Sequence, residues 1–207
     1  MPVAHVVVDY QNIHLTGHGL WCPGSEQAHL CLIHPLHYAN QVLTQRNLIK
    51  RLVCDRDGLD FEPVTLGDVR SFRGLPSNRH DPSNYRRSLA QQSEWTRDAR
   101  SRVHLRPLKY YPLGGGRFDI KEKGIDVLVA LELVKIAAAL PAGDIVILAS
   151  HDTDQEPALE LACQLAAGQV ETTGWMNSKR LRAPGVSVWH TQLEEQAFIK
   201  ARDLKTY

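Results

Sequence analysis

Short, unbroken apolar runs alternate along this chain with longer segments of helical period. The runs at Val3–Asp9 and Asp144–Ala149 are rich in β-branched residues, which is typical of strands buried on both faces. Ile125–Leu140 is the strongest helical segment, and because it is apolar nearly all round we expect it to be well buried. Strands that alternate with helices in this way form β-α-β units. The sequence therefore predicts an α/β fold with a mostly parallel central sheet flanked by helices.

The sequence patterns for the remaining helices and strands are weaker. A chain of 207 residues suffices for one domain. We expect a single domain over residues 1–207, with a core at about 3–175, a loop insertion at 55–82, and a C-terminal strand and helix at 186–207. Turn-forming residues, including Pro23 and Gly24, predict a long irregular loop at Tyr10–His34. Further helices are expected at Pro35–Gln45, Ser83–Ser101 and Asp152–Gly168, strands at Leu48–Cys54, Val103–Tyr111, Val170–Trp175 and Val186–Trp189, a flexible connection at Leu113–Arg117, and a last helix opened by a capping box at Thr191-x-x-Glu194.

No apolar run reaches the roughly 18 residues of a membrane span, and the first five residues do not resemble a signal peptide. Cys54 and Cys163 lie in apolar contexts, as core thiols do. We therefore expect a reduced, cytoplasmic protein that does not contact a membrane. A zinc site in the segment 14–37 stays open, although its spacing matches no common zinc motif and exposed loop histidines fit it better. The histidines and cysteines of this segment are His14, His18, Cys22, His29, Cys31, His34 and His37.

Positive charge is concentrated in the middle of the chain, although the formal net charge is only +1. Residues 70–123 hold 13 Lys/Arg against 5 Asp/Glu, which leaves the remainder acidic. Such a distribution suits a polyanion held beside a cation-binding acidic cluster, while a solvated basic helix is the plainer interpretation. We expect Arg86 and Arg87 to bind substrate within a phosphate track of Arg70, Arg73, Arg79, Arg86, Arg87, Arg97 and Arg100. The alternative track is Arg106, Lys109, Arg117, Lys121 and Lys123.

Four aspartates fall at the ends of predicted elements. Asp9 closes the first strand, Asp126 lies in the first turn of the apolar helix, and Asp152 and Asp154 follow the strand I-V-I-L-A. Each alone is explained as a helix cap. Together they are not, because carboxylates about 4 Å apart repel by about 4 kcal/mol at an effective dielectric near 20. Oxygen ligands favour Mg²⁺ or Mn²⁺ over zinc, so the acids predict such a site at the carboxyl edge of the sheet.

Three stretches around these acids resemble the NYN domain, a family of the PIN-like nuclease superfamily. They are V-V-V-D-Y-Q-N-I-H at Val6–His14, K-E-K-G-I-D-V at Lys121–Val127 and I-L-A-S-H-D-T-D-Q-E-P-A-L-E at Ile147–Glu160, and the resemblance spans Val3–Trp175. It implies a PIN-like three-layer sandwich in which Asp9, Asp126, Asp152 and Asp154 are both metal ligands and catalytic residues. It also places the family's asparagine at Asn12 and its small hydroxyl residue at Thr153, both as substrate-binding residues.

The resemblance implies a metal-dependent endoribonuclease that hydrolyses RNA phosphodiester bonds with Mg²⁺ or Mn²⁺ and needs no protein nucleophile. Lys121 and Lys123, beside Asp126, are expected to hold a phosphate, or else to form a solvated loop. His151 and Gln155 stand where the family has glycine and an aromatic residue, which bears on substrate choice more than on catalysis. The alternative is a catalytically inactive PIN-like module that binds RNA or a protein partner. The terminal helix offers a surface for a homodimer.

Three other interpretations fit less well. A phosphatase of the D-x-D kind would carry that motif after the first strand, whereas the D-T-D at Asp152–Asp154 comes late. A Toprim-type site usually begins with a glutamate, and it leaves Asn12 and Asp126 without a role. The glycines Gly114–Gly116 lack the lysine and hydroxyl residue of a phosphate-binding loop. Five aromatic residues could stack on bases, although aromatic residues at strand ends are more often part of the core. They are Trp95, Trp175, Trp189, Tyr110 and Tyr111.

Overall fold

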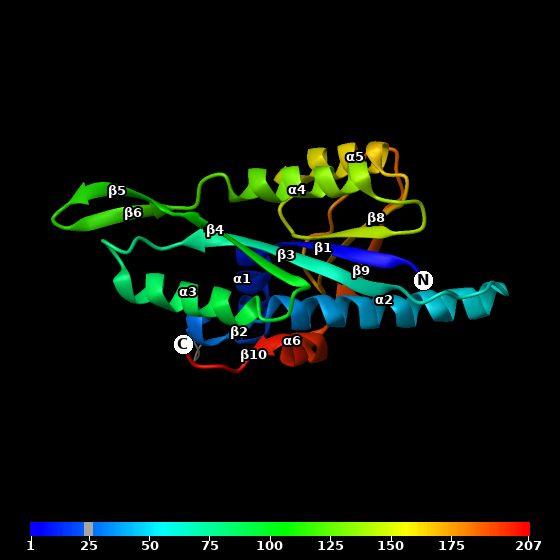
Figure 1. Cartoon of the computed structure of the whole chain (residues 1–207), viewed down its shortest axis with the longest axis horizontal. Helices are drawn as coiled ribbons and strands as arrows, with labels where there is room; N and C mark the ends of the chain where they lie inside the picture. Colours follow the sequence, from blue (N-terminus) through cyan, green and yellow to red (C-terminus); the bar gives the residue numbers. More distant parts are fainter. Residues whose placement is uncertain (23–26) are drawn as a thin grey trace.

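A single all-parallel sheet of six strands forms the middle layer of the protein, in the order β4-β3-β1-β7-β8-β9. The computed structural model describes residues 1–22 and 27–207. The α/β sandwich with a parallel central sheet is therefore confirmed (Figure 1). The strands are β1 (Val3–Asp9), β3 (Thr65–Leu75), β4 (Ser101–Pro107), β7 (Ile145–Ala149), β8 (Gln169–Trp175) and β9 (Trp189–Leu193).

Helices cover both faces of this sheet (Figure 1). One face carries α4 (Ile125–Ala139) and α5 (Glu156–Leu165), and the other carries α1 (Tyr10–Trp21), α2 (Pro35–Asp57), α3 (Pro82–Trp95) and α6 (Glu195–Ala201). The hairpin of β5 (Lys109–Gly114) and β6 (Arg117–Lys121) projects beyond the sheet (Figure 1). The short elements are η1 (Ala28–Leu30), η2 (Thr153–Gln155), and β2 (Leu32–Ile33) paired with β10 (Arg202–Asp203).

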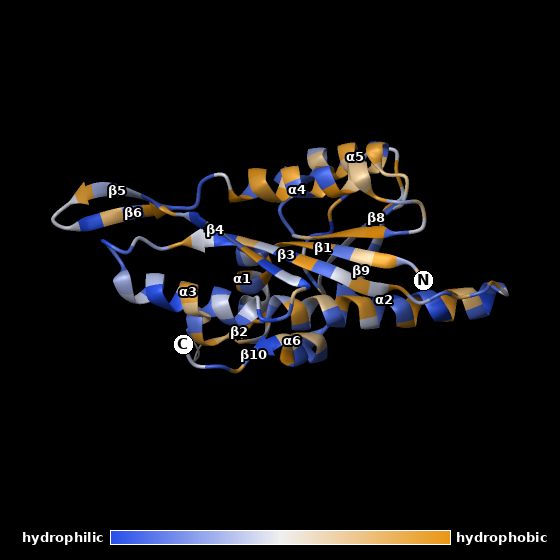
Figure 2. Cartoon of the chain, viewed as in Figure 1, coloured by the Kyte–Doolittle hydropathy of each residue, from blue (hydrophilic) through white to orange (hydrophobic). Residues whose placement is uncertain are grey.

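The apolar core is divided by the sheet, because neighbouring residues of a strand point to opposite faces. Val6 and Val8 of β1 pack toward α2, whereas Val7 packs toward α4. Hydrophobic residues accordingly concentrate on β1 and α4 (Figure 2). The strand order reverses between β1 and β7, and at such a switch point the carboxyl ends of the strands open a crevice.

The expected strand at Leu48–Cys54 is wrong, because α2 runs unbroken through it for 23 residues. Its β-branched and apolar residues imitate a strand, but no breaker separates them from the helix that begins at Pro35. His34 caps the start, and Gly58 ends the helix in the left-handed conformation, with φ 67°. The helix expected at Pro35–Gln45 is thus only the first half of α2.

The expected loop insertion at 55–82 is also wrong, because it contains the 11-residue strand β3, which pairs with β1. Polar and charged residues interrupt the apolar pattern that would predict this strand. Asp68 forms ion pairs with His5 on β1 and with Arg70, so its charge is matched inside the sheet. Gly67 adds to the loop-like appearance, yet a Cβ there would lie 2.4 Å from Val3 Cγ1.

The expected loop at Tyr10–His34 is largely ordered structure. Helix α1 starts directly after β1, with Asp9 as its N-cap. Gly17 suggests a breaker in sequence, but a Cβ there would lie 2.9 Å from Trp175 Nε1, so close packing requires glycine. Pro23 and Gly24, on which that expectation also rested, lie outside the described residues.

The C-terminal third is shifted relative to expectation. The sheet continues past Trp175 to β9, which starts at Trp189 rather than Val186. Thr191 lies inside that strand and Glu194 caps α6, so the expected capping box is wrong.

Three smaller differences concern the middle of the chain. The expected third strand divides into β4 and β5, and the flexible connection is the turn of the β5–β6 hairpin. Helix α4 is less buried than expected, with Val127 and Leu131 59% and 61% exposed. Within the described ranges, no helix has the length and hydropathy to cross a membrane.

Candidate metal centre

Three of the four predicted aspartates gather at the carboxyl ends of β1 and β7. Asp9, Asp126 and Asp152 each offer a carboxylate oxygen, and these oxygens all lie within 4.8 Å of one another. Oxygens bound to one Mg²⁺ at about 2.1 Å lie roughly 3 to 4 Å apart, so small side-chain rotations close the site around a cation. The strand ends and the first turn of α4 thus bring these acids together as the sequence predicts.

Asp9 is the buried member of the cluster, at 3% exposure. Ser150 Oγ donates a hydrogen bond to Asp9 Oδ2 over 3.0 Å, and the Asn12 backbone N donates to Asp9 Oδ1 over 3.4 Å. Ser150 Oγ also accepts a hydrogen bond from the Asp152 backbone N at 3.1 Å. Ser150 therefore connects the ends of β1 and β7. Sequence reasoning missed this role, although a hydroxyl residue before the D-T-D was its signal.

Burial and mutual repulsion make the charged forms of these carboxylates unfavourable without a cation. Burial raises the pKa of Asp9 to about 7, and the charges of Asp126 and Glu122 add to the rise against the hydrogen bonds from Ser150 and Asn12. Burial also raises the pKa of Asp126, followed by the charges of Asp152 and Asp154. A divalent cation would offset both the burial of these carboxylates and the repulsion between them, and the donor set of carboxylate oxygens fits Mg²⁺ or Mn²⁺.

Asp154 stands at the rim of the cluster. It is exposed, and its backbone N donates to Asp152 Oδ1 over 3.0 Å. Its charge still reaches Asp126. Thr153 lies beside it in η2. The four-acid site predicted from the sequence is therefore an inner group of three acids with Asp154 outside it.

Glu122 is an acid that sequence reasoning missed. Its Oε1 accepts a hydrogen bond from the Gly74 backbone N at 2.8 Å, and its charge contributes to the raised pKa of Asp9. Burial raises the pKa of Glu122 itself, with a further contribution from Asp126. Glu122 stands in the K-E-K-G stretch before Asp126, but only the two lysines beside it were assigned a role from the sequence.

Two polar side chains hold the segments that carry the acids. Asn12 Oδ1 accepts a hydrogen bond from the His151 backbone N at 2.8 Å, so this oxygen orients the loop after β7. Gln155 is almost fully buried, and its Nε2 donates to the Asp126 backbone O over 3.1 Å. Gln155 thus ties η2 to the first turn of α4. A role of Asn12 in binding substrate stays a prediction.

The His151 ring is held by backbone groups outside the acid cluster. Its Nδ1 donates to the Lys179 backbone O over 3.0 Å, and its Nε2 accepts from the Trp175 backbone N at 3.3 Å. Burial lowers its pKa. A Cβ on Gly174 would lie 2.2 Å from His151 Cε1, so the ring occupies space that this glycine leaves.

The basic residues divide between two places. Arg86 and Arg87 lie on α3, which covers the sheet face opposite α4, and Arg87 NH1 donates to Asn84 Oδ1 over 2.9 Å (Figure 1). Arg70 is already paired with Asp68 and Glu132. Of the arginine track, Arg73 interacts electrostatically with Glu122 beside the acids, whereas Arg86 and Arg87 lie on α3.

The alternative basic track is better placed. Lys109 and Lys121 pair across the β5–β6 hairpin, whose end leads into α4 and Asp126. Arg106 Nε donates to the Lys123 backbone O over 2.7 Å. Lys121 Nζ lies 3.1 Å from Asp119 Oδ2, so this lysine is partly neutralised, whereas Lys123 is exposed close to Asp126 in sequence.

The His/Cys-rich segment is more structured than expected. His14 is buried rather than exposed, and His34 caps α2 and stacks on His37 with ring centroids 4.2 Å apart. Cys22 and Cys31 form a disulfide, whereas the sequence led us to expect reduced thiols. Cys54 and Cys163 are free and only half-buried, and Cys163 packs against the edge of the core.

Comparison with known proteins supports the fold and nothing finer. No protein-family model matches the chain, and no curated protein matches it. A crystal structure of a protein of unknown function from Vibrio parahaemolyticus is similar, with a TM-score of 0.54 and 14% identity, over 97% of this chain and 96% of that chain. The likeness at this identity shows the three-layer α/β architecture alone.

Proposed function

We propose that the protein is a metal-dependent endoribonuclease of the NYN kind, which hydrolyses RNA phosphodiester bonds with Mg²⁺ or Mn²⁺. One observation carries the proposal: Asp9, Asp126 and Asp152 come from three separate segments and meet at the switch point of the sheet. The buried Asp9, with its pKa raised to about 7, makes a purely structural role for these acids costly.

The residues divide the chemical work between them. Asp9, Asp126 and Asp152 would hold the cation, and Asp154 at the rim would orient a water molecule or hold its proton. A bound Mg²⁺ or Mn²⁺ supplies charge stabilisation for the phosphate and activation of the attacking water. Ser150 and Gln155 keep the ligand-bearing segments in register through their hydrogen bonds.

RNA is the proposed substrate because a positively charged arm leads to the acids. Arg117 and Lys109 lie on the projecting β5–β6 hairpin, and Lys123 follows it toward Asp126. Tyr111 on the same hairpin is 42% exposed, and exposed aromatic rings stack on unpaired bases. These features fit a single strand that reaches the acids along the hairpin.

The test is cleavage of labelled single-stranded RNA by purified protein with Mg²⁺, Mn²⁺ or EDTA. We expect cleavage with metal only, products with a 5′-phosphate, and loss of cleavage in Asp152→Asn. Asp57→Asn is the matched control, since Asp57 is an exposed acid at the end of α2. RNA that is bound but left intact under every metal would show that the protein is a non-cleaving binding module instead.

Cytoplasmic location and a homodimer stay predictions from the sequence. Phe198 and Ala201 of α6 are buried within their own chain, whereas Ile199 on the same helix is 50% exposed. Cell fractionation and light scattering on the purified protein test the two expectations.

A further inference from the structure

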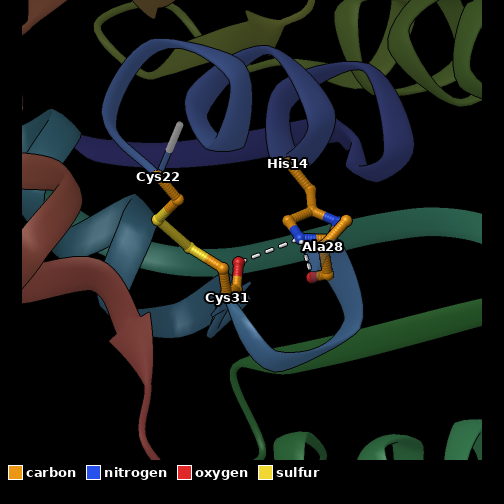
Figure 3. The surroundings of a disulfide bond; sticks show 4 residues. All are labelled: His14, Cys22, Ala28 and Cys31. Carbon is orange, nitrogen blue, oxygen red and sulfur yellow. Dashed lines mark hydrogen bonds between the residues drawn. A yellow bond between two sulfur atoms is a disulfide. The ribbon is translucent and has the colours of Figure 1, made fainter. Parts of the chain in front are cut away.

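A second group of potential metal ligands lies at the far end of α1 from the acids. His18, Cys22 and Cys31 each offer a ligand atom, and these atoms all lie within 4.8 Å of one another. Figure 3 shows the disulfide that joins Cys22 to Cys31. These residues belong to the His/Cys-rich segment of the sequence, and the proposed nuclease site makes no use of them.

The three ligands come from two elements that the fold holds together. His18 and Cys22 are one helical turn apart at the end of α1, where the Cys22 backbone N donates to the His18 backbone O over 2.8 Å. Cys31 lies opposite, fully buried after η1. Residues four apart on a helix face one side, as the two histidines of H-E-x-x-H metal sites do.

The position of Cys31 does not depend on the disulfide alone. His14 Nε2 donates to the Cys31 backbone O over 2.9 Å and to the Ala28 backbone O over 3.0 Å (Figure 3). Burial lowers the pKa of His14 to about 4, so the ring stays neutral and keeps these bonds at neutral pH. The segment that carries Cys31 therefore remains attached to α1 when the sulfurs are separated.

An independent observation points to a ligand at this place. His18 Nδ1 is buried and makes no hydrogen bond within the described part of the chain. A buried polar nitrogen without a partner is costly, and its lone pair is suited to a metal ion. The Cα atoms of Cys22 and Cys31 are 7.1 Å apart, beyond the usual disulfide range of about 4.4 to 6.8 Å. Two sulfurs bound to one zinc lie about 3.8 Å apart, which accommodates a wider backbone separation.

We propose that the protein binds Zn²⁺ through His18, Cys22 and Cys31 when the disulfide is reduced, with the fourth position open to water or another ligand. A dithiol reductant supplies two electrons, and with two protons the S–S bond becomes two thiols. Zinc then displaces both thiol protons and binds the two thiolates and one imidazole nitrogen, a donor set that selects zinc over Mg²⁺. The inference goes beyond the proposed nuclease activity and does not rest on it.

Cobalt provides the test, because Co²⁺ occupies such sites and thiolate ligands give it a strong near-ultraviolet charge-transfer absorption that carboxylates do not. We expect one equivalent of Co²⁺ to produce this band in the reduced, metal-stripped protein, and one equivalent of Zn²⁺ to remove it. The oxidised protein should give no band, a control that needs no substitution. A reduced protein without the band would overturn the proposal.

Variants assign the ligands. Cys31→Ser should abolish the band and His18→Gln should weaken it, whereas Cys54→Ser/Cys163→Ser should retain it, since both of these cysteines are free. Asp152→Asn should also retain it, which separates this site from the acids. A band that survives in Cys31→Ser, or disappears in Cys54→Ser/Cys163→Ser, contradicts the assignment.

A melting measurement covers the case in which a variant folds poorly. Zn²⁺ should raise the Tm of the reduced parent protein by mass action, and by more than it raises that of the oxidised protein, in which only the acids remain to bind it. An equal rise in both redox states would place the zinc elsewhere, and no rise in the reduced protein would exclude the site.

Discussion

The two ends of helix α1 carry opposite kinds of ligand. Asp9 at its start belongs to a group of oxygen donors, whereas His18 and Cys22 near its end belong to a group of nitrogen and sulfur donors. The helix has 12 residues, so these ends are about 18 Å apart. The acids can relieve their repulsion only by protonation or by a cation. The two cysteines have a covalent alternative, which makes the second site dependent on redox conditions and the first on pH.

Loss of an acid from the cluster beside the start of α1 should have the largest effect. Asp126→Asn is expected to lower metal-dependent RNA cleavage by roughly 10³-fold or more, because the charge stabilisation lost is several kcal/mol. Cys22→Ser/Cys31→Ser, at the other end, should leave the rate close to that of the parent. Single-turnover cleavage rates measure both. Similar losses in the two variants would mean that the ends of α1 are not independent.

Gln155 should have the next largest effect, since it positions a ligand without touching the metal. Gln155→Ala removes the hydrogen bond to the Asp126 backbone O and is expected to weaken Mn²⁺ binding by about 10 to 100-fold. The matched control is Gln91→Ala, because Gln91 is also buried but bonds Arg73. Titration calorimetry with Mn²⁺ tests the pair, and equal affinities in Gln155→Ala and the parent would remove Gln155 from the site.

Basic residues on the β5–β6 hairpin should differ from basic residues on α3 as contacts for RNA phosphates. Lys109→Ala/Arg117→Ala on the hairpin should flatten the log-log dependence of RNA affinity on salt by up to about 1.4, at about 0.7 per phosphate contact. Arg86→Ala/Arg87→Ala should leave the slope unchanged, because Arg87 borders a hollow with His29 and Leu30, on the cysteine side of α1. Affinity measured against salt decides, and a flatter slope in the α3 variant alone would restore the original track.

The smallest effect concerns pH and stability. The pKa of Asp9 is raised from 3.8 to about 7 in the folded protein, so the folded state binds the extra proton between these values. Without metal, this contribution to stability is present at low pH and is lost as the pH rises through about 7. Asp9→Asn should lack this decline, so that at pH 8 its metal-free Tm exceeds that of the parent by roughly 2 to 4 °C per kcal/mol relieved.

With Mn²⁺ at pH 8, the Tm of the parent protein should instead exceed that of Asp9→Asn. Above the pKa of Asp9 the carboxylate is charged, so Mn²⁺ should raise the Tm of the parent and have a smaller effect on Asp9→Asn. Thermal melts at pH 5 and pH 8, with and without Mn²⁺, give the four values needed. A parent Tm indifferent to both pH and Mn²⁺ would count against an open cation site.

The sequence was informative where burial is uniform along an element. Strands β1 and β7 were found because each is a short run rich in β-branched residues, and Asp9, Asp152 and Asp154 were found because they lie at or just after the ends of those strands. Strand β3 was missed since its polar residues are matched only after folding, as Asp68 is by His5. The roles of Ser150 and Gln155 were missed for the same reason. Their bonding partners lie on other elements, and single-sequence patterns do not encode such pairings.

Asp9 has two tasks, because it is both the N-cap of α1 and the buried acid of the cluster. Its Oδ1 accepts a hydrogen bond from the Asn12 backbone N, and a cation bound to the same carboxylate competes for that oxygen. The hydrogen bond in the first turn of α1 should therefore weaken when a cation binds to the acids. Hydrogen exchange at the Asn12 amide, followed by NMR while a diamagnetic ion such as Mg²⁺ is added, would report the filling of the site from a backbone position that the substrate need not touch.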